Sequence, residues 1–439
     1  MTSAAAPASP ATRGQVIAWG FWDWGNAAFN AVILTFVFSV YLTSAVGDGA
    51  PSASAALGWS IGVAGIALAV VAPVLAARAD AAGRRKRATG VWTVATVVVM
   101  AAMVAVRDDS QYLALGLILL ALGSVFSELA AVSYNAMLCQ VSTPATMGRI
   151  SGFGWAMGYL GGIVLLLGLY LGFIRDNDDG TAGLLAISTA DGWNIRLVAL
   201  IAAGWFLVSA IPMFVAVPEI PPDPNRPARI GVVASYRKLF SDVREIYRRD
   251  PHALWFLLSS ALYRDGLAGI FTFASVLAVG VYGIDAADVL IFGVAANVVS
   301  AAGAFAGGAI EDRVGAKPVI VASLIGLIAV GVILLFVSGP TMFWIFGLFL
   351  SLFVGPAQSS SRTFLARIAP AGREGQFFGL YATTGRAASF LAPTLFGLFV
   401  TLFEATRAGI VGIVAVLVVG LAVFLPVRAP GRAPITLPN

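Results

Sequence analysis

Charge, cysteine and histidine are scarce in this sequence. Of its 439 residues 11% are charged, one is Cys139 and one is His252. Soluble domains carry about a quarter charged residues. A chain with so little charge and 59% hydrophobic residues cannot cover itself with polar surface, so we expect its solvent to be largely lipid. One cysteine excludes an internal disulfide, and one cysteine with one histidine excludes a thiolate or imidazole metal cage. We therefore expect no metal and no cofactor.

Long apolar windows recur along the chain from Val16 to Val427. A helix needs about 20 mostly apolar residues to cross a bilayer. The windows predict an all-α polytopic membrane protein with twelve transmembrane helices. These spans are expected at 16–44, 57–77, 88–106, 112–140, 148–174, 194–217, 252–281, 286–310, 317–338, 341–366, 375–403 and 407–427.

A net charge of +5 could indicate a protein that binds nucleic acid, but the placement of the basic residues argues against this. Of the 27 Lys and Arg, four lie in the loops that face one side of the membrane (Arg107, Arg175, Arg196, Arg407) and three lie within spans (27 − 4 − 3 leaves 20 on the other side). Cytoplasmic loops carry such a basic excess. We therefore expect a multi-pass cell-membrane protein with both termini cytoplasmic, in contact with anionic lipid and not with nucleic acid.

The longest polar stretch divides the chain near its middle. It runs over 218–251, and its second part places apolar and basic residues at the spacing of an amphipathic helix. No cleavable leader is expected before the first span. We predict five segments: a disordered tail (1–15), a six-helix bundle (16–217), a cytoplasmic linker (218–251), a second six-helix bundle (252–427) and a tail (428–439).

Matching markers on the two sides of the linker indicate an internal repeat. The loop after span 2 reads Asp80-Ala-Ala-Gly83-Arg-Arg85, and the loop after span 8 reads Asp312-Arg-Val-Gly315-Ala-Lys317. The segment Trp22-Asp23-Trp24-Gly25 in span 1 aligns loosely with Tyr263-Arg264-Asp265-Gly266 in span 7. Two six-span halves of the same orientation are the layout of major facilitator transporters.

The loop at Asp312 also resembles the characteristic loop motif of the major facilitator superfamily, with Gly308 as its leading glycine. The span 1 segment from Phe21 to Phe29, the span 7 segment Leu262–Gly266 and the span 11 segment Gln376–Tyr381 resemble the vacuole-effluxer branch of that superfamily. The resemblance implies two pseudo-symmetric bundles in which spans 1, 4, 7 and 10 line a central cavity. It also implies that spans 2 and 11, and spans 5 and 8, meet across the halves. Fungal members are linked to amino-acid efflux from the vacuole.

The repeat predicts a reciprocal inner gate. A carboxylate is stabilised at the positive end of a helix dipole. We expect Asp80 to face the start of span 11 near Arg373, and Asp312 to face the start of span 5 near Arg149. The gating residues predicted are Asp80, Arg149, Asp312, Arg313 and Arg373. The alternative is a basic turn that only fixes topology.

Ionisable residues inside the spans are the candidates for the substrate and coupling site, because a charge within the bilayer is costly and is usually functional. The candidates are Asp23, Asn26, Asn30, Glu128, Arg264, Asp265, Gln358 and Arg386. We expect Asp23 and Arg264, at equivalent repeat positions, to pair across the empty cavity and to bind or gate the solute. Glu128, whose repeat equivalent is Gly355, is expected to lack a cationic partner and to carry a proton. A structural ion pair between helices is the alternative for each acid, and for Arg362 the alternative is a side chain that extends to the lipid headgroups.

Glycines recur on the helices expected at the interface of the halves, among them Gly148 and Gly152 in span 5 and Gly308 in span 8. Small residues let helix backbones approach closely. They are consistent with surfaces that slide during transport and equally with ordinary tight packing.

We therefore expect a secondary transporter that moves a small polar solute, with an amino acid and proton coupling as candidates. The chain has no Walker lysine motif, so ATP is not the expected driver. The alternatives are a proton-coupled drug or metabolite exporter and a non-transporting receptor. An enzyme is not expected, since no nucleophile–base pair or metal set is recognisable. We expect a monomer.

Overall fold

The computed structural model describes residues 11–177, 179–219, 251–284 and 286–429, together with Tyr236, Arg237, Ser241, Arg244 and Arg248 between them. Twelve helical segments of this described part are long and apolar enough to cross a membrane. Each lies on one of the predicted windows, so the prediction of an all-α protein with twelve spans is confirmed. The amphipathic helix predicted in the linker lies almost entirely outside the described residues.

The first half contains spans 1–6. Its elements are α1 (Arg13–Ala27), the π-helix η1 (Ala28–Phe36), α2 (Phe38–Ser44), α3 (Pro51–Ala81), α4 (Arg85–Ala102), η2 (Met103–Ala105), η3 (Ser110–Tyr112), α5 (Leu113–Ala136), α6 (Leu138–Val141), α7 (Met147–Leu169), the π-helix η4 (Tyr170–Ile174), η5 (Ala190–Gly192) and α8 (Trp193–Ala216). A two-stranded antiparallel hairpin, β1 (Thr181–Ala182) and β2 (Ile187–Ser188), connects spans 5 and 6.

The second half contains spans 7–12. Its elements are α10 (Pro251–Gly280), α11 (Ala286–Val314), α12 (Ala316–Phe336), α13 (Pro340–Ile368), α14 (Glu374–Ala388), α15 (Leu391–Phe403), η6 (Thr406–Ala408) and α16 (Gly409–Phe424). Span 11 is therefore two helices, α14 and α15, separated by a break at Ser389 and Phe390.

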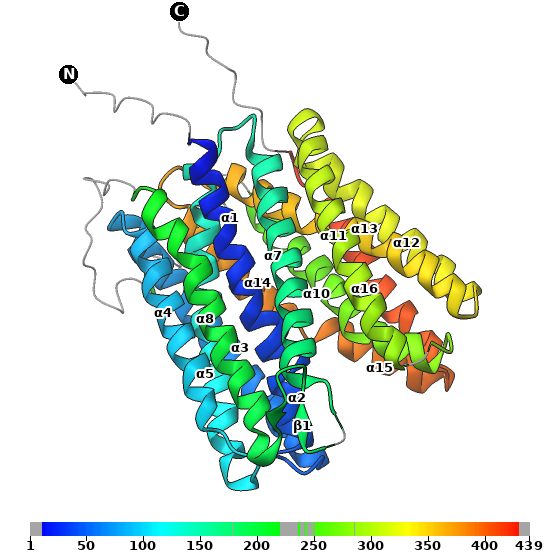
Figure 1. The fold of residues 1–439 in the computed structure, drawn as a ribbon. Coiled ribbons are helices and arrows are strands. Elements are labelled where there is room, and N and C mark those ends of the chain that lie inside the picture. Colours follow the sequence, from blue (N-terminus) through cyan, green and yellow to red (C-terminus); the bar gives the residue numbers. More distant parts are fainter. Residues whose placement is uncertain are drawn as a thin grey trace, which may run out of the picture.

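The helices form two bundles that touch near one end and diverge toward the other (Figure 1). Contact between the bundles is made mainly by α3 with α14 and by α7 with α11. These are spans 2 with 11 and 5 with 8, as the resemblance implied. Because the number of described spans is even, α1 begins and α16 ends at the same end of the molecule, which we call the closed end.

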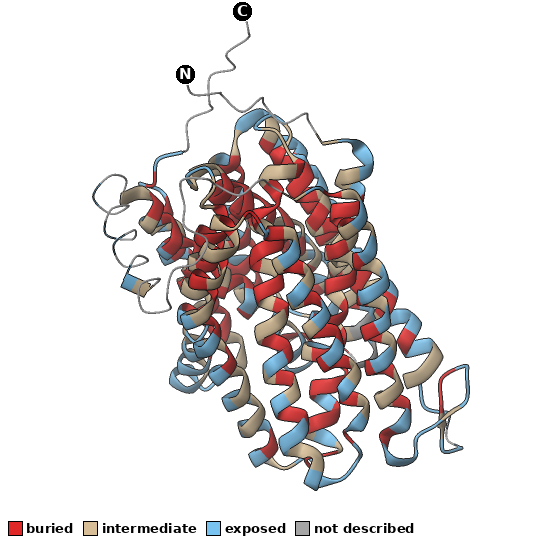
Figure 2. Cartoon of the chain, turned by 90° about the vertical axis from the view of Figure 1, so that its left-hand side faces the viewer, coloured by how far each residue is buried: buried red, intermediate tan, exposed pale blue. Residues whose placement is uncertain are grey.

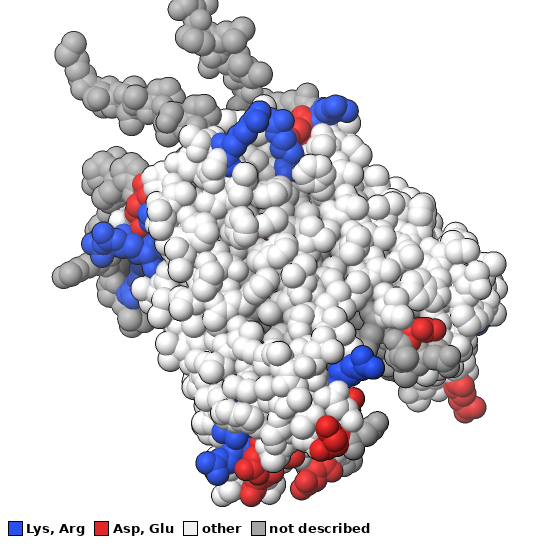
Figure 3. All heavy atoms as spheres, viewed as in Figure 1, with Lys and Arg blue, Asp and Glu red and all other residues white. Residues whose placement is uncertain are grey.

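Exposed positions lie on the outside of the bundles and buried positions on their inner faces (Figure 2). Many of the exposed positions carry large hydrophobic side chains. On α4, for example, Val91, Val94 and Val98 recur at helical spacing and are 62%, 51% and 59% exposed. Lys, Arg, Asp and Glu gather at the two ends of the molecule and leave an uncharged band between them (Figure 3). A charge-free belt of this kind matches the hydrocarbon core of a bilayer.

The two halves share an internal contact, which is evidence of the repeat: in each, a lysine at one helix start donates hydrogen bonds to the end of another helix. Lys86, at the start of span 3, donates from Nζ to the carbonyls of Phe214 (3.2 Å) and Val217 (2.8 Å) at the end of span 6. Lys317, at the start of span 9, donates to the carbonyls of Leu425 (2.7 Å) and Val427 (2.6 Å) at the end of span 12. Each lysine thus satisfies carbonyls that a helix end leaves open, at the negative end of its dipole.

Glycine makes the contact between α7 and α11 possible. A Cβ placed on Gly308 would meet the carbonyl of Gly148 and lie 3.1 Å from the Cα of Arg149, so the two backbones approach directly. Gly152 packs in the same way on the backbone of Ala304. The other glycines of span 5 do not share this interface: Gly161 packs on Trp24 and Gly162 on Ala27, both in α1.

We expect Gly308→Val to separate α7 from α11 and to weaken the closed end, because the added atoms have no space between two backbones. Overpacking of this kind costs about 1–3 kcal/mol. The measurement is the thermal unfolding midpoint of the purified protein. Gly58→Val is the matched control, since a Cβ on Gly58 in α3 meets no atom within 4 Å. Equal unfolding midpoints for the two variants would contradict the close approach.

Candidate functional site

A buried arginine crosses between the two halves at the closed end. Arg362 lies on α13, and its side chain is 5% exposed. Its Nη1 atom donates to Asp23 Oδ2 of α1 at 3.2 Å and to Asn135 Oδ1 of α5 at 3.1 Å. Its Nε and Nη2 atoms donate to the hydroxyl (2.9 Å) and the carbonyl (2.6 Å) of Ser151 on α7. One guanidinium from the second half thereby binds three helices of the first.

Aromatic rings enclose this ion pair. The guanidinium carbon of Arg362 lies 5.0 Å from the ring centre of Trp19 and 5.8 Å from that of Trp155. Tyr134 donates its hydroxyl to Asp23 Oδ2 at 3.0 Å and stacks on the rings of Trp19 and Trp22. Charges in such an apolar surrounding attract each other more strongly than in water, and they are costly if they are separated.

This geometry corrects two expectations. The predicted pair of Asp23 with Arg264 is wrong in this structure, because Asp23 binds Arg362. Arg264 instead lies over the ring of Tyr381 in its own half, 3.8 Å from the ring centre, and donates to the Tyr381 carbonyl at 3.4 Å. The expectation that Arg362 extends to the headgroups is also wrong, since its side chain turns inward and is buried.

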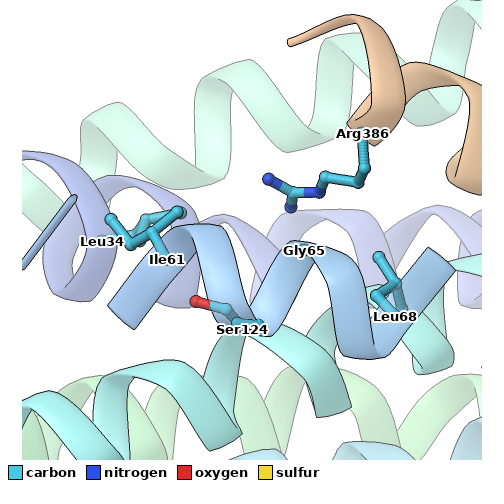
Figure 4. A pocket seen from close by; sticks show the side chains of 7 residues that line it. Leu34, Ile61, Gly65, Leu68, Ser124 and Arg386 are labelled. Atoms are coloured by element: carbon cyan, nitrogen blue, oxygen red, sulfur yellow. The ribbon is translucent and has the colours of Figure 1, made fainter. Parts of the chain in front are cut away.

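Glu128 has a cationic partner, contrary to the sequence-based expectation. Glu128 Oε2 on α5 lies 3.6 Å from Arg386 Nη2 on α14, and the two side chains are 31% and 30% exposed. Arg386 also lines a pocket with Leu34, Ile61, Leu68 and Ser124 of the first half (Figure 4). This pair joins the two halves, but it is longer and more exposed than the Asp23–Arg362 pair.

The remaining candidates fall in different places. Asn26 is buried within the first half, where its Oδ1 accepts from the hydroxyl of Ser127 at 3.0 Å. Asn30 is exposed and Gln358 is partly buried. Asp265 is buried in the second half, and its Oδ2 accepts from the N–H of Ala392 at 2.6 Å, so it caps the start of α15 where span 11 is broken. The structure therefore does not bring Asp265 into one cluster with Asp23.

The gating acids lie at helix starts, as the repeat predicted. Asp312 accepts from the N–H groups of Gly148 (2.8 Å) and Arg149 (3.3 Å), and its Oδ2 lies 3.6 Å from Arg149 Nε. Asp80 Oδ2 accepts from the N–H of Gln376 at 3.0 Å at the start of α14. Arg313 is exposed at the end of α11, and Arg373 directly precedes α14. The gating roles of these residues remain a proposal.

Four charged residues of the closed end are not among the predicted gating residues: Arg85, Glu311, Arg367 and Glu374. Arg85 binds Asp80 Oδ1 from Nε at 2.6 Å and contacts Glu374 of α14 from Nη2, and all three side chains are buried or nearly so. The cation beside Asp80 is thus Arg85. Glu311 is buried on α11 and pairs with Arg367 at 3.1 Å. Arg85 and Glu374 adjoin the predicted gate residues in sequence, which was the available signal. Among the described residues no group of three or more His, Cys, Asp or Glu is placed to hold a metal ion.

Comparisons with solved structures agree with the two-bundle arrangement. The chain resembles the proton:xylose symporter XylE of the major facilitator superfamily, with a TM-score of 0.71, 13% identity and coverage of 93% of this chain and 94% of that one. It resembles the human organic anion transporter MFSD10 with a TM-score of 0.71, 14% identity and coverage of 94% and 100%. At these identities the likeness shows the fold. The protein therefore has the multi-pass membrane fold of the major facilitator superfamily.

Sequence comparison gives the family. The family model described as vacuole effluxer Atg22 like matches residues 140–431, which is most of the chain, and the chain belongs to this family. An uncharacterized MFS-type transporter, YxiO, of Bacillus subtilis is 26% identical over 94% of this chain and 95% of its own length. Autophagy-related protein 22 of Yarrowia lipolytica is 24% identical over 63% of this chain, which matches only 50% of that longer protein.

Proposed function

We propose that this protein is a secondary transporter that moves a small polar solute across the bacterial cell membrane by alternating access. The observation that carries the proposal is the set of contacts that Arg362 makes between the halves. It joins α13 to three helices of the other half at the closed end, while the bundles diverge toward the opposite end (Figure 1). Polar contacts between rigid bundles can break and reform as the bundles rock, and this is how the accessible side of a central site alternates.

A solute with both charges fits the side chains between the bundles. Glu128 and Arg386 are partly exposed on facing helices, and Arg264 is partly buried on α10. An amino acid is the leading candidate, and the membership in the Atg22-like effluxer family supports it. Within this proposal Glu128 is the proton carrier and Asp23 is the gating residue that closes on Arg362.

Uptake into sealed proteoliposomes tests the function. We expect radiolabelled amino acids to accumulate or exchange in vesicles with the purified protein and not in empty vesicles. Asp23→Asn should reduce transport strongly, because Arg362 would be left buried without its counter-charge. Glu128→Gln should preserve exchange but remove its dependence on a proton gradient. Normal transport by Asp23→Asn, or a fully proton-driven Glu128→Gln variant, would show that these roles are wrongly assigned.

The orientation of the chain is a separate proposal with a separate test. We propose that both termini lie in the cytoplasm, and the basic excess of the loops on that side supports this orientation. Cysteines introduced singly at Asp179 and Arg237 in a Cys139→Ser background report the two sides. We expect a membrane-impermeant maleimide to label position 179 in intact cells and to label position 237 only after permeabilisation. Labelling in the reverse order would overturn the proposed topology.

A further inference from the structure

Cations exceed anions on the walls between the bundles once the internal pairs are assigned. Asp23 and Arg362 neutralise each other, and Asp265 caps α15 inside the second half. Glu128, Arg264 and Arg386 remain, which is one anion against two cations. Arg264 lies against the backbone of Gly385, with Nη1 3.2 Å from where a Cβ of that glycine would stand, so the two arginines occupy neighbouring positions on α10 and α14. An anionic group of a solute would balance this set.

The geometry of the Glu128–Arg386 pair allows a carboxylate of a solute to replace Glu128. Its N–O distance of 3.6 Å is long for a charge-assisted hydrogen bond, which is usually about 2.7–2.9 Å. Both side chains are about 30% exposed, and partly solvated pairs of this kind contribute little, about 0–1 kcal/mol. Arginine binds carboxylates through two parallel N–H···O bonds. A carboxylate that binds Arg386 in this way gains more than Glu128 loses.

The space beside Arg386 has an amphipathic lining. The stem of Arg386 passes over Gly65 of α3, with Cδ 3.8 Å from where a Cβ of that glycine would stand. Leu34, Ile61 and Leu68 supply apolar surface on the same side, and Ser124 supplies a hydroxyl (Figure 4). The cavity itself is small, about 10 Å³. A ligand with one anionic end and a short apolar chain matches the chemistry of these residues, and α3 and α14 must move apart to admit it.

We propose that Arg386 is the anchor for a carboxylate of the transported solute, and that Glu128 occupies the place of this carboxylate in the empty protein. Arg264 is the second cation of the site, and the apolar part of the solute lies against Leu34, Ile61 and Leu68. This inference rests on the proposed transport function and names the group by which the solute is recognised. The carboxylate can belong to a zwitterion or to a simple carboxylic acid.

Four compounds with the same six-carbon chain separate these possibilities: norleucine, norleucinamide, hexanoate and hexylamine. Binding to the purified full-length protein is measured by isothermal titration calorimetry. We expect norleucine or hexanoate to bind, and the two compounds without a carboxylate to bind at least about tenfold more weakly. Binding of norleucine alone indicates a zwitterion, and binding of both acids indicates that the carboxylate suffices. Tighter binding of hexylamine or norleucinamide would overturn the proposal.

Variants test the two partners in opposite directions. Arg386→Gln should weaken carboxylate binding by roughly tenfold or more, and Arg386→Lys, which retains the charge without the planar fork, by less. Glu128→Gln should strengthen hexanoate binding severalfold, because the internal competitor is removed. A purely structural pair predicts that Glu128→Gln does not tighten binding. Arg87→Gln, at the exposed start of α4, is the matched control and should bind as the unmodified protein does.

Transport assays keep this inference separate from the proposed function. Uptake of a solute that does not depend on its carboxylate or on Arg386 would overturn the anchor and leave the transporter assignment standing. Carboxylate binding to Arg386 without uptake or exchange in proteoliposomes would support the anchor and overturn the transporter assignment.

Discussion

Arg362→Ala is expected to release the closed end of the protein. The substitution leaves Asp23, whose side chain is 18% exposed, without its counter-charge and removes four hydrogen bonds that Arg362 makes to α1, α5 and α7. Breaking a buried ion pair by removal of one partner costs about 3–5 kcal/mol. A loss of that size shifts the balance between closed and open ends by roughly a hundredfold or more. We expect transport to be lost, and the closed end to become accessible.

The single native cysteine reports this opening. Cys139, on α6 of the first half, contacts the carbonyl of Ala366 on α13 of the second half, with an Sγ–O distance of 4.0 Å. Its alkylation by a maleimide should be slow in the unmodified protein and much faster in Arg362→Ala. The double variant Asp23→Asn with Arg362→Ala, which leaves no unpaired charge, should lose less than the two single changes together. Unchanged alkylation of Cys139 in Arg362→Ala would show that Arg362 does not hold this end closed.

The fold could be predicted from the sequence because lipid imposes a simple rule. A helix satisfies its own backbone in hydrocarbon, so long apolar windows predict spans such as α12 and α16. The contact of Asp312 with the start of span 5 could also be predicted from the sequence. The repeat places this acid beside the start of span 5, and Gly315, with φ of +94°, makes the tight turn that the motif requires.

The partners of the intramembrane charges could not be predicted in the same way. The repeat gives the position of Asp23 and Arg264 along their helices but not which helix each side chain meets. Arg264 finds the ring of Tyr381 beside it, so it needs no acid from the other half. Arg362 appeared too close to the end of span 10, yet its long side chain returns to Asp23. Glu128 and Arg386 are not equivalent in the repeat, so symmetry gave no reason to pair them.

The two gates of the closed end should contribute unequally, although the repeat makes them look alike. Arg85 is 4% exposed and bridges two acids, Asp80 of its own half and Glu374 of the other. Arg149 is 62% exposed, and Asp312 retains the N–H groups of Gly148 and Arg149 without it. Loss of the buried, doubly paired cation leaves two carboxylates without a counter-charge, of which Asp80 keeps the N–H of Gln376. Loss of the exposed cation leaves one carboxylate, which two N–H groups still cap.

We therefore expect Arg85→Met to destabilise the protein by about 3 kcal/mol or more and Arg149→Met by less than about 1 kcal/mol. The two substitutions remove the same charge and retain a similar unbranched side chain, so each is the control for the other. Thermal unfolding of the purified variants gives the stability, and the alkylation rate of Cys139 gives the opening of the closed end. Arg85→Met should accelerate alkylation and Arg149→Met should not. Equal effects of the two substitutions would mean that the closed end depends on the helix-start contacts of Asp80 and Asp312, which both variants retain, and not on the buried arginine.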